Sequence, residues 1–226
     1  MQFKIRASAS GKIVGLPRSK KDREAGILSE GAKTYCEDWL KEQLYKRRKE
    51  FTSKYTDKGN VMEDNSLDFI AERLKYGILI KNEKRYENDF MTGTPDVVLE
   101  NVLIDVKNSW DCFTFPRFAK EIPNKDYYWQ AQSYMELTGV DKYKLIYVLS
   151  DTPKHLIERE AFFYAKNNGY EELSSEMYDE FEKKMTYGDI DNKDKIKVFD
   201  IDRNDEDIDF IMEQVVKCRN FINGLS

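Results

Sequence analysis

The sequence predicts an α/β protein with a mixed central β-sheet flanked by helices. Segments with apolar residues at helical spacing alternate along the chain with short runs rich in Val, Ile and Leu. Apolar residues make up 40% of the 226 residues, enough to fill a core, and no repeat or low-complexity linker divides the chain. We therefore expect one domain over residues 1–226, with a basic part at 1–58, a central core at about 59–150 and acidic helices and a strand at 151–226.

The first half of the chain predicts two helices followed by a strand meander. Ser29 can cap a helix that runs to about Phe51, and a second helix follows Gly59 and stops at Gly77. The hydrophobic period then changes, which predicts strands at 78–80, 96–99 and 102–107. A turn at Glu100-Asn101 joins the last two strands into a hairpin.

The second half continues the alternation. A helix is expected over 127–137, ended by Gly139, and a buried strand over 144–149. Helical stretches follow over about 154–184, then a strand at 196–199 and a helix at about 204–222. The resulting order is α, α, β, β, β, α, β, followed by further helices and a strand.

Composition excludes several classes of protein. No run of about 18 or more apolar residues is present and residues 1–6 lack an apolar signal region, so we expect a cytoplasmic protein without a membrane span. Three scattered cysteines (Cys36, Cys112 and Cys218) do not make a disulfide framework. His155 is the one histidine, which argues against a zinc finger or a Ser-His-Asp enzyme.

Charge is distributed unevenly along the chain. The net charge is −5, but residues 1–60 carry +7, residues 61–150 carry −4 and residues 151–226 carry −8. A basic first quarter on an acidic chain favours a polyanionic partner. Either Lys20, Lys21 and Arg23 or the run Lys46–Lys49 would contact it. The alternative for Lys46–Lys49 is a solvated helix end that complements the helix dipole.

The residues that carry chemistry lie in the meander. Asp105 and Lys107 are two residues apart on one strand and share a face, and an adjacent hairpin strand can set Asp96 opposite Asp105. Two facing carboxylates repel unless a cation lies between them, and oxygen-only ligands favour Mg²⁺ or Mn²⁺. The backbone carbonyl of Val106 is a further oxygen ligand, and the Lys107 ammonium can hold or deprotonate a water and offset phosphate charge.

Simpler structural roles remain open for these residues. Asp96 after Pro95 can be a turn residue, and Asp105 with Lys107 can be a surface pair on a solvated face. The aromatic run Tyr127-Tyr128-Trp129 can stack on bases or belong to the core. Trp110, Phe113 and Phe115 can form a wedge at a cleft mouth or a hydrophobic cluster.

Pro95-Asp96, eight residues, then Asp105-Val106-Lys107 resembles the signature of the PD-(D/E)XK nuclease superfamily. The restriction-endonuclease-like core of that superfamily has the order αβββαβ, which matches the order of elements above. Two further motifs, Gln130-Ala131-Gln132-Ser133-Tyr134 and Gly59-x-x-x-Glu63, are similar to those of the branch that contains lambda exonuclease, YqaJ-like phage exonucleases and the RecB nuclease domain.

The resemblance implies a site on these positions. It makes Glu63, Asp96 and Asp105 ligands of Mg²⁺ or Mn²⁺, with Glu72 as the alternative helix ligand, and makes Lys107 catalytic. Gln130 and Tyr134 would line the same cleft, one helical turn apart.

Two other features of the sequence concern its similarity to the branch that contains lambda exonuclease. Arg6-Ala7-Ser8 looks like the Arg and Ala-Ser that hold a 5′-phosphate in lambda-type exonucleases, although the spacing differs. The four cysteines of the iron–sulfur nucleases are absent, so no iron–sulfur cluster is expected.

The sequence therefore predicts a metal-dependent deoxyribonuclease, with a phage-type exonuclease that resects duplex ends for recombination as the leading expectation. DNA is the expected partner, and a homo-oligomer and a single-strand annealing protein are further candidates. The alternatives are a structure-specific or restriction-like endonuclease and a catalytically silent nucleic-acid-binding protein of the same fold. A nucleotide-dependent metabolic enzyme would need a Gly-rich phosphate loop, which we do not find.

Overall fold

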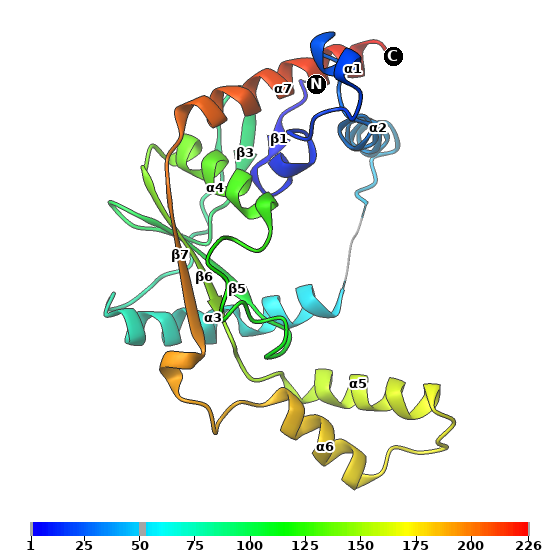
Figure 1. Cartoon of the computed structure of the whole chain (residues 1–226), viewed down its shortest axis with the longest axis vertical. Helices are drawn as coiled ribbons and strands as arrows, with labels where there is room; N and C mark the ends of the chain where they lie inside the picture. The colour runs from blue at the N-terminus through cyan, green and yellow to red at the C-terminus, as the bar shows by residue number, and fades with distance from the viewer. Residues whose placement is uncertain (1, 50–52, 226) are drawn as a thin grey trace.

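Two β-sheets surrounded by helices form the computed structural model, which describes residues 2–49 and 53–225 (Figure 1). The larger sheet has the strand order β4-β5-β6-β7. Its strands are β4 (Val97–Val98), β5 (Leu103–Asn108), β6 (Lys142–Val148) and β7 (Ile196–Asp202). Strands β5 and β6 run parallel and the other two pairs are antiparallel, so the predicted mixed α/β sheet is confirmed.

The smaller sheet, of order β1-β3-β2, was not predicted. It consists of β1 (Ile5–Arg6), β2 (Tyr86–Glu87) and β3 (Met91–Gly93). Two or three residues are too few to show a period of two, so the pattern of the sequence carries little signal for such strands.

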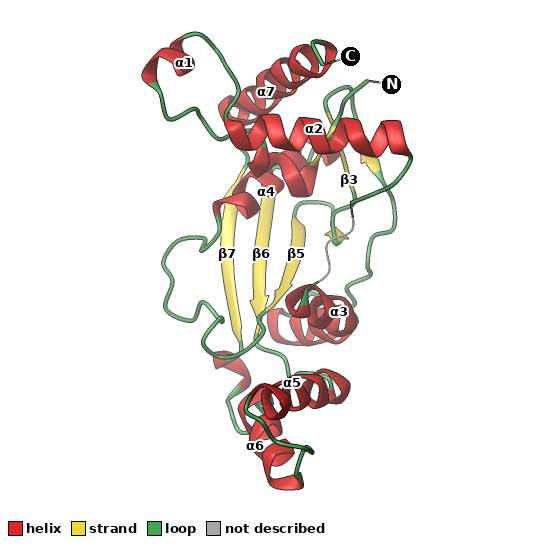
Figure 2. Cartoon of the chain, turned by 90° about the vertical axis from the view of Figure 1, so that its right-hand side faces the viewer, coloured by secondary structure: helices red, strands yellow, loops and turns green. Residues whose placement is uncertain are grey.

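The helices in the described part of the chain are α1 (Lys20–Glu24), α2 (Glu30–Tyr45), α3 (Lys54–Leu74), α4 (Lys125–Thr138), α5 (Lys154–Asn167), α6 (Ser175–Met185) and α7 (Asp205–Asn223), with short 3₁₀ helices η1 (Ala7–Lys12) and η2 (Asn192–Asp194). Of these, α3 and α4 cover opposite faces of the larger sheet. Figure 2 shows α4 above the strands and α3 below them, with the α5–α6 hairpin extending beyond α3.

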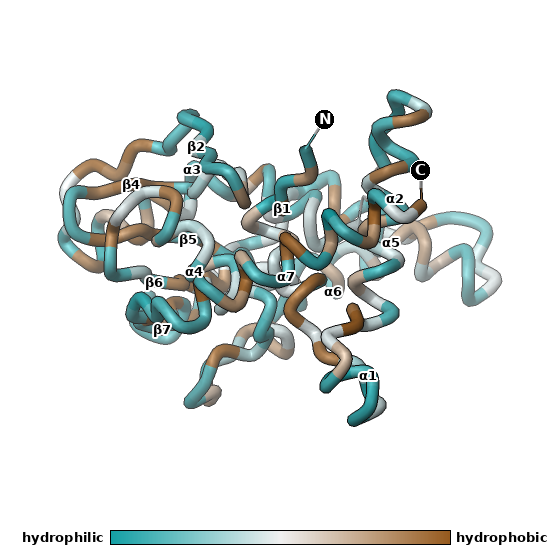
Figure 3. The backbone as a smooth tube through the Cα atoms, turned by 90° about the horizontal axis from the view of Figure 1, so that it is seen from above, coloured by the Kyte–Doolittle hydropathy of each residue, from teal (hydrophilic) through white to brown (hydrophobic). Residues whose placement is uncertain are grey.

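Alternation along β5 divides the core into two layers. Leu103 packs with Ala131 and Tyr134 of α4, whereas Ile104 and Val106 pack with Leu67 of α3. A third cluster joins β1 and η1 to α2 and α7. Hydropathy alternates along these helices, as one-sided burial requires (Figure 3). Strand β5 is therefore covered on both faces, which fixes its position.

The largest differences between the predicted and the observed elements lie in residues 45–80. Residues 78–80 are not a strand: the side chains of Ile78 and Ile80 are 86% and 76% exposed, and an exposed unpaired segment gains nothing from its strand-forming residues. Helix α3 begins at Lys54, because Ser53 and Thr56 form a capping box, so Gly59 lies inside the helix. Helix α2 ends at Tyr45, where Lys46 is left-handed, and the predicted end at Phe51 lies outside the described residues.

None of the helices in the described part of the chain is long and apolar enough to cross a membrane.

A buried lysine ties α3 to the strand ends. Lys58 is fully buried, and its Nζ donates hydrogen bonds to the backbone oxygens of Trp110 (2.9 Å) and Ser150 (2.7 Å). Burial lowers the pKa of Lys58 to about 8, although the carboxylates of Asp151 and Asp111 oppose this shift.

Lys58→Met should lower the free energy of unfolding by about 2 kcal/mol or more, because it leaves two carbonyls without their donor. Urea denaturation measures this. Lys54→Met, one turn earlier on α3 in a half-exposed pair with Glu160, is the matched control and should cost about 1 kcal/mol or less.

The cost of Lys58→Met should also grow from pH 7 to pH 10. The unfolded chain holds the Lys58 proton up to its ordinary pKa of 10.5, whereas the folded chain releases it near 8. Since the unfolded state then binds more protons than the folded state, the free energy of unfolding of the wild type rises with pH across that window, and Lys58→Met lacks this rise. A cost that stays constant between pH 7 and pH 10 would show that Lys58 keeps its proton in the folded chain across that window.

Candidate active site

The register of the β4–β5 hairpin brings two carboxylates together. Val97 pairs with Ile104 and Val98 with Leu103, so the same antiparallel register sets Asp96 opposite Asp105. The Asp96 carboxylate folds back onto β5, where its Oδ2 accepts a hydrogen bond from the Val106 amide at 2.9 Å. The predicted juxtaposition of Asp96 and Asp105 is present in the structure.

Asp105 is the most deeply buried of these groups, with 1% of its side chain exposed. Its Oδ1 accepts a hydrogen bond from Gln130 Nε2 of α4 at 3.0 Å. Its Oδ2 lies 2.5 Å from the Lys107 ammonium in an ion pair, yet makes no well-directed hydrogen bond. A buried carboxylate oxygen thus retains capacity for a further cationic partner.

The electrostatics of the cluster follow from this proximity. Burial and then the Asp105 carboxylate raise the pKa of Asp96 to about 7. Burial alone would lower the pKa of Lys107, but the carboxylates of Asp105 and Asp96 outweigh it and raise that pKa above its ordinary value. Lys107 is therefore charged at neutral pH in this arrangement, so it can hold a water or a phosphate oxygen but not accept a proton.

These groups open onto a cleft of about 490 Å³. Asp96 and Lys107 line it together with Glu63 of α3, and Tyr127 of α4 contributes an aromatic wall. The remaining lining residues are Tyr55, Thr56, Gly59, Asn60, Val106, Asn108, Ser109, Trp110, Thr114 and Tyr147.

The lining of the cleft distinguishes between Glu63 and Glu72, the two candidate metal ligands on α3. Glu63 is directed to it and pairs there with Lys81 (Oε2 to Nζ 2.6 Å). Glu72 is 70% exposed, pairs with Arg73 and is not among the residues that line the cleft. The structure thus favours Glu63 over Glu72 as the acidic residue of α3 nearest the cluster.

The residues present are suited to a hard divalent cation. Their oxygen donors, the spare capacity at Asp105 Oδ2 and the repulsion between Asp96 and Asp105 all fit Mg²⁺ or Mn²⁺. Within residues 2–49 and 53–225, however, no three acidic, histidine or cysteine side chains are close enough to enclose a metal ion. Glu63 would have to leave Lys81 to join the two aspartates.

Helix α4 supports the cluster through several of the predicted residues. Gln130 holds Asp105, and the Tyr134 hydroxyl donates to the Thr94 backbone oxygen at 3.1 Å, two residues before Asp96. Tyr127 faces the cleft with the Lys107 ammonium 4.8 Å from its ring centre. Trp129 instead packs against Phe210 in the core. The aromatic run therefore divides between the two roles considered for it.

The predicted DNA-binding residues do not share one surface. Arg6 lines a second cavity of about 510 Å³ with Lys4, Arg48 and Arg85. Ser8 is exposed on η1 and lines neither cavity. Lys20, Lys21 and Arg23 lie on α1 at the far end of the molecule from α3 (Figure 1) and also line neither.

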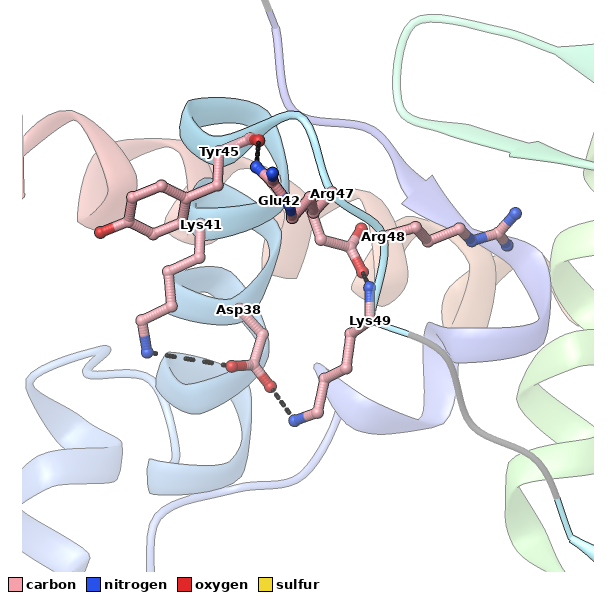
Figure 4. Close-up of a pocket in the computed structure, with 7 residues that line it drawn as sticks. All are labelled: Asp38, Lys41, Glu42, Tyr45, Arg47, Arg48 and Lys49. Carbon is pink, nitrogen blue, oxygen red and sulfur yellow. Dashed lines mark hydrogen bonds and ion pairs between the residues drawn. The ribbon is translucent and has the colours of Figure 1, made fainter.

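The second cavity, called the basic cavity below, is positive in spite of the acidic chain. Glu42 is the one acidic residue among those that line it, and it accepts a hydrogen bond from the Lys49 amide. Lys41 and Lys49 both pair with Asp38, whereas Figure 4 shows Arg48 extending away from these side chains. Arg48 makes no hydrogen bond or ion pair with the described residues.

Sequence reasoning missed Lys81 and Arg85. Lys81 and Arg85 belong to the charged run 81–85, which follows the segment wrongly expected to be a strand, so nothing marked it as part of the site. Arg48 belongs to the run Lys46–Lys49 that was expected to contact a polyanion, but its place beside Arg6 in the lining of one cavity depends on the packing of distant segments, which no local pattern reports.

A mixed β-sheet flanked by helices, with an acidic pair beside a lysine at the β4–β5 hairpin, is the combination that characterises nucleases of the PD-(D/E)XK class. The comparisons agree. A phage-related exonuclease from Haemophilus somnus 129PT is 31% identical, with a TM-score of 0.82 over 100% of this chain and 96% of that one. The chain belongs to the lambda-exonuclease-like family of phage exonucleases.

More distant structures share the fold. The alkaline exonuclease LHK-Exo from Laribacter hongkongensis is 14% identical with a TM-score of 0.61, over 98% of this chain and 89% of that one. The structure of LHK-Exo in complex with dAMP shows 15% sequence identity and a TM-score of 0.62, over 98% of this chain and 91% of that one. No family model and no curated protein sequence matches the chain.

Gly93→Ala should lower stability by about 1–3 kcal/mol, because the new Cβ would lie 2.6 Å from Tyr134 Cε1 and 2.9 Å from Ala7 Cβ. Gly59→Ala is the control: apart from the adjoining backbone of its own helix, no atom lies within 4 Å of the place that the new Cβ would take, and alanine favours the helix, so stability should rise by up to about 1 kcal/mol. Thermal unfolding of both variants checks this, and equal effects would contradict the close packing of β3 on α4.

Proposed function

We propose that the protein is a Mg²⁺- or Mn²⁺-dependent deoxyribonuclease that degrades DNA from its ends. The observation that carries the proposal is the Asp96–Asp105 pair beside Lys107, of which Asp96 and Lys107 line the cleft. Hydrolysis of a phosphodiester needs cations to meet the charge of the transition state and a water made nucleophilic near pH 7. Carboxylates that hold a divalent cation, with a lysine beside them, meet both needs.

In this proposal Glu63, Asp96, Asp105 and the Val106 carbonyl hold the metal ion. When bound, the ion supplies Lewis-acid stabilisation of the phosphate and lowers the pKa of water. Gln130 keeps the Asp105 carboxylate oriented through its hydrogen bond, and Tyr134 fixes the backbone just before Asp96. Lys107, charged and half-buried, holds the attacking water or a phosphate oxygen in place.

The exonuclease form of the activity is supported by the relatives. The Haemophilus somnus protein is called a phage-related exonuclease, and LHK-Exo has been crystallised with dAMP. A role in phage recombination, with a single-strand annealing protein or further copies of the chain as partners, belongs to the same proposal.

A single gel assay distinguishes the proposed exonuclease from the two alternatives, an endonuclease and a catalytically silent binding protein. The purified protein with Mg²⁺ should degrade linear duplex DNA and leave closed circular duplex intact. Cleavage of the closed circle would favour the endonuclease alternative, and binding without any cleavage would favour the catalytically silent alternative.

The metal requirement can be tested directly. Mg²⁺ or Mn²⁺ should support degradation of linear duplex, because the donors are oxygens around two close carboxylates. Ca²⁺, which is larger and has looser geometry, should allow DNA binding with little turnover. Full activity in excess EDTA would show that the aspartates do not act through a metal ion.

Substitutions should separate the roles of Asp105 and Lys107. Asp105→Asn should lose both Mn²⁺ binding and cleavage. Lys107→Met should lose cleavage by roughly 10²-fold or more, yet still bind Mn²⁺, because an ammonium is not a ligand and competes for Asp105 in the metal-free protein. Calorimetric titration with Mn²⁺ and a nuclease assay report the two properties. A Lys107→Met protein that cleaves at the wild-type rate would overturn the role of the lysine.

The basic cavity is the proposed grip on the DNA backbone. Thr92 lines it and is four residues from Asp96, so it lies within about 14 Å of the catalytic pair. A phosphate of the strand that reaches the cleft, including a terminal 5′-phosphate, can therefore enter the cavity. Contacts to Lys20, Lys21 and Arg23 remain a proposal for DNA further from the cleft.

Arg48→Ala together with Arg85→Ala should weaken duplex binding and flatten its dependence on salt, by about 0.9 in log–log slope for each phosphate that the protein no longer neutralises. Alanine at Lys20, Lys21 and Arg23 should have the smaller effect. Fluorescence anisotropy at several salt concentrations measures both, and the reverse order would place the DNA along α1.

A further inference from the structure

One phenylalanine stands out in the turn that follows β5. Trp110 and Phe115 are buried in this turn, but the Phe113 side chain between them is 93% exposed. Full exposure of a phenylalanine forgoes the burial that usually stabilises such a residue. The two roles considered for these aromatics therefore separate: Trp110 and Phe115 are core residues, and Phe113 is not.

The turn holds Phe113 outward rigidly. Asp111 Oδ1 accepts hydrogen bonds from the amides of Phe113 (3.1 Å) and Thr114 (2.8 Å), and Thr114 Oγ1 accepts one from the Asp111 amide (3.0 Å). The turn is also tied to its surroundings, since Lys58 donates to the Trp110 backbone oxygen and the Cys112 amide donates to the Tyr187 hydroxyl (3.2 Å).

The turn also borders the catalytic cleft. Trp110 and Thr114 both line the cleft, so Phe113 is one residue, about 3.8 Å along the chain, from a lining residue. In Figure 1 the green connection after β5 runs beside the cyan start of α3, which contributes Tyr55 and Glu63 to the same cleft. Phe113 thus stands at the rim of the cleft, with its ring free.

The chemistry of the neighbouring cleft decides what this ring meets. Two carboxylates and a lysine suit a phosphodiester, and a phosphodiester carries its bases at a fixed covalent distance to either side. Every base presents a π-face, and aromatic side chains stack on bases without regard to sequence. A protein partner would instead need a contiguous apolar patch, whereas the residues around Phe113 in this turn are Asp111, Cys112 and Thr114.

We propose that Phe113 stacks on a base of the DNA strand next to the scissile phosphate and so fixes the position of the strand in the cleft. The inference rests on the proposed nuclease function and adds a substrate-positioning residue to it.

The test compares binding of Phe113→Ala, Phe113→Trp and the wild type to end-labelled DNA, with Ca²⁺ in place of Mg²⁺ and again in EDTA. Phe118→Ala is the matched control, because Phe118 is equally exposed (93%) in the same connection but lies next to no residue that lines the cleft. A substrate series carries one abasic nucleotide, moved along the first few positions from the end. Thermal unfolding of each variant accompanies the measurement.

Phe113→Ala should weaken binding roughly ten- to hundred-fold without changing the melting temperature, and Phe113→Trp should restore it. The effect of Phe113→Ala should disappear on the one substrate whose abasic site removes the stacked base. Phe118→Ala should stay within about two-fold of the wild type.

Equal effects of Phe113→Ala and Phe118→Ala, no effect of Phe113→Ala, or an effect that no abasic position removes would overturn the stacking. In each of these cases the wild type still degrades linear DNA, so the nuclease function survives. A wild type that neither binds nor cleaves DNA would instead overturn the proposed function, and the stacking with it.

Discussion

The repulsion between two close carboxylates, Asp96 at the cleft and the buried Asp105, governs the arrangement of this molecule. The hairpin register forces Asp96 against Asp105 in a place with little access to water, which raises the pKa of Asp96 to about 7. Each neighbouring group reduces that cost: the Val106 amide donates to Asp96, Gln130 donates to Asp105, and Lys107 contributes a full positive charge. Such a site is held in place only because α3 and α4 bury β5 from both sides.

The same electrostatics explain how an acidic protein can meet an acidic polymer. Negative charge that lies in the cleft is matched locally, by Lys107 at Asp105 and by Lys81 at Glu63. Positive charge is in excess in the basic cavity, where Arg6, Arg48 and Arg85 come together from three separate segments and Glu42 is the one acidic residue of the lining. The net charge of −5 is therefore a poor guide to the field near the site, because attraction of phosphate depends on the local lining.

The sequence predicted the parts of the site that depend on short-range patterns. The β4–β5 hairpin, the shared face of Asp105 and Lys107, and the one-turn spacing of Gln130 and Tyr134 all follow from the periods of strands and helices. The smaller sheet was missed because its strands are too short to show a period, and 78–80 was wrongly made a strand on composition alone. The pairing of Lys81 with Glu63 and the approach of Arg48 to Arg6 depend on tertiary contacts between segments with no common pattern.

The central claim is that the carboxylates of Asp96 and Asp105 bind the catalytic cation, and that the Lys107 ammonium offsets their negative charge in the metal-free protein. Diffraction from crystals soaked in Mn²⁺, measured at the manganese absorption edge, tests it most directly. The account predicts an anomalous peak in contact with the carboxylates of both Asp96 and Asp105, with Glu63 released from Lys81. A Mn²⁺-free cluster in which Lys107 still pairs with Asp105, at Mn²⁺ concentrations that support DNA cleavage, would contradict it.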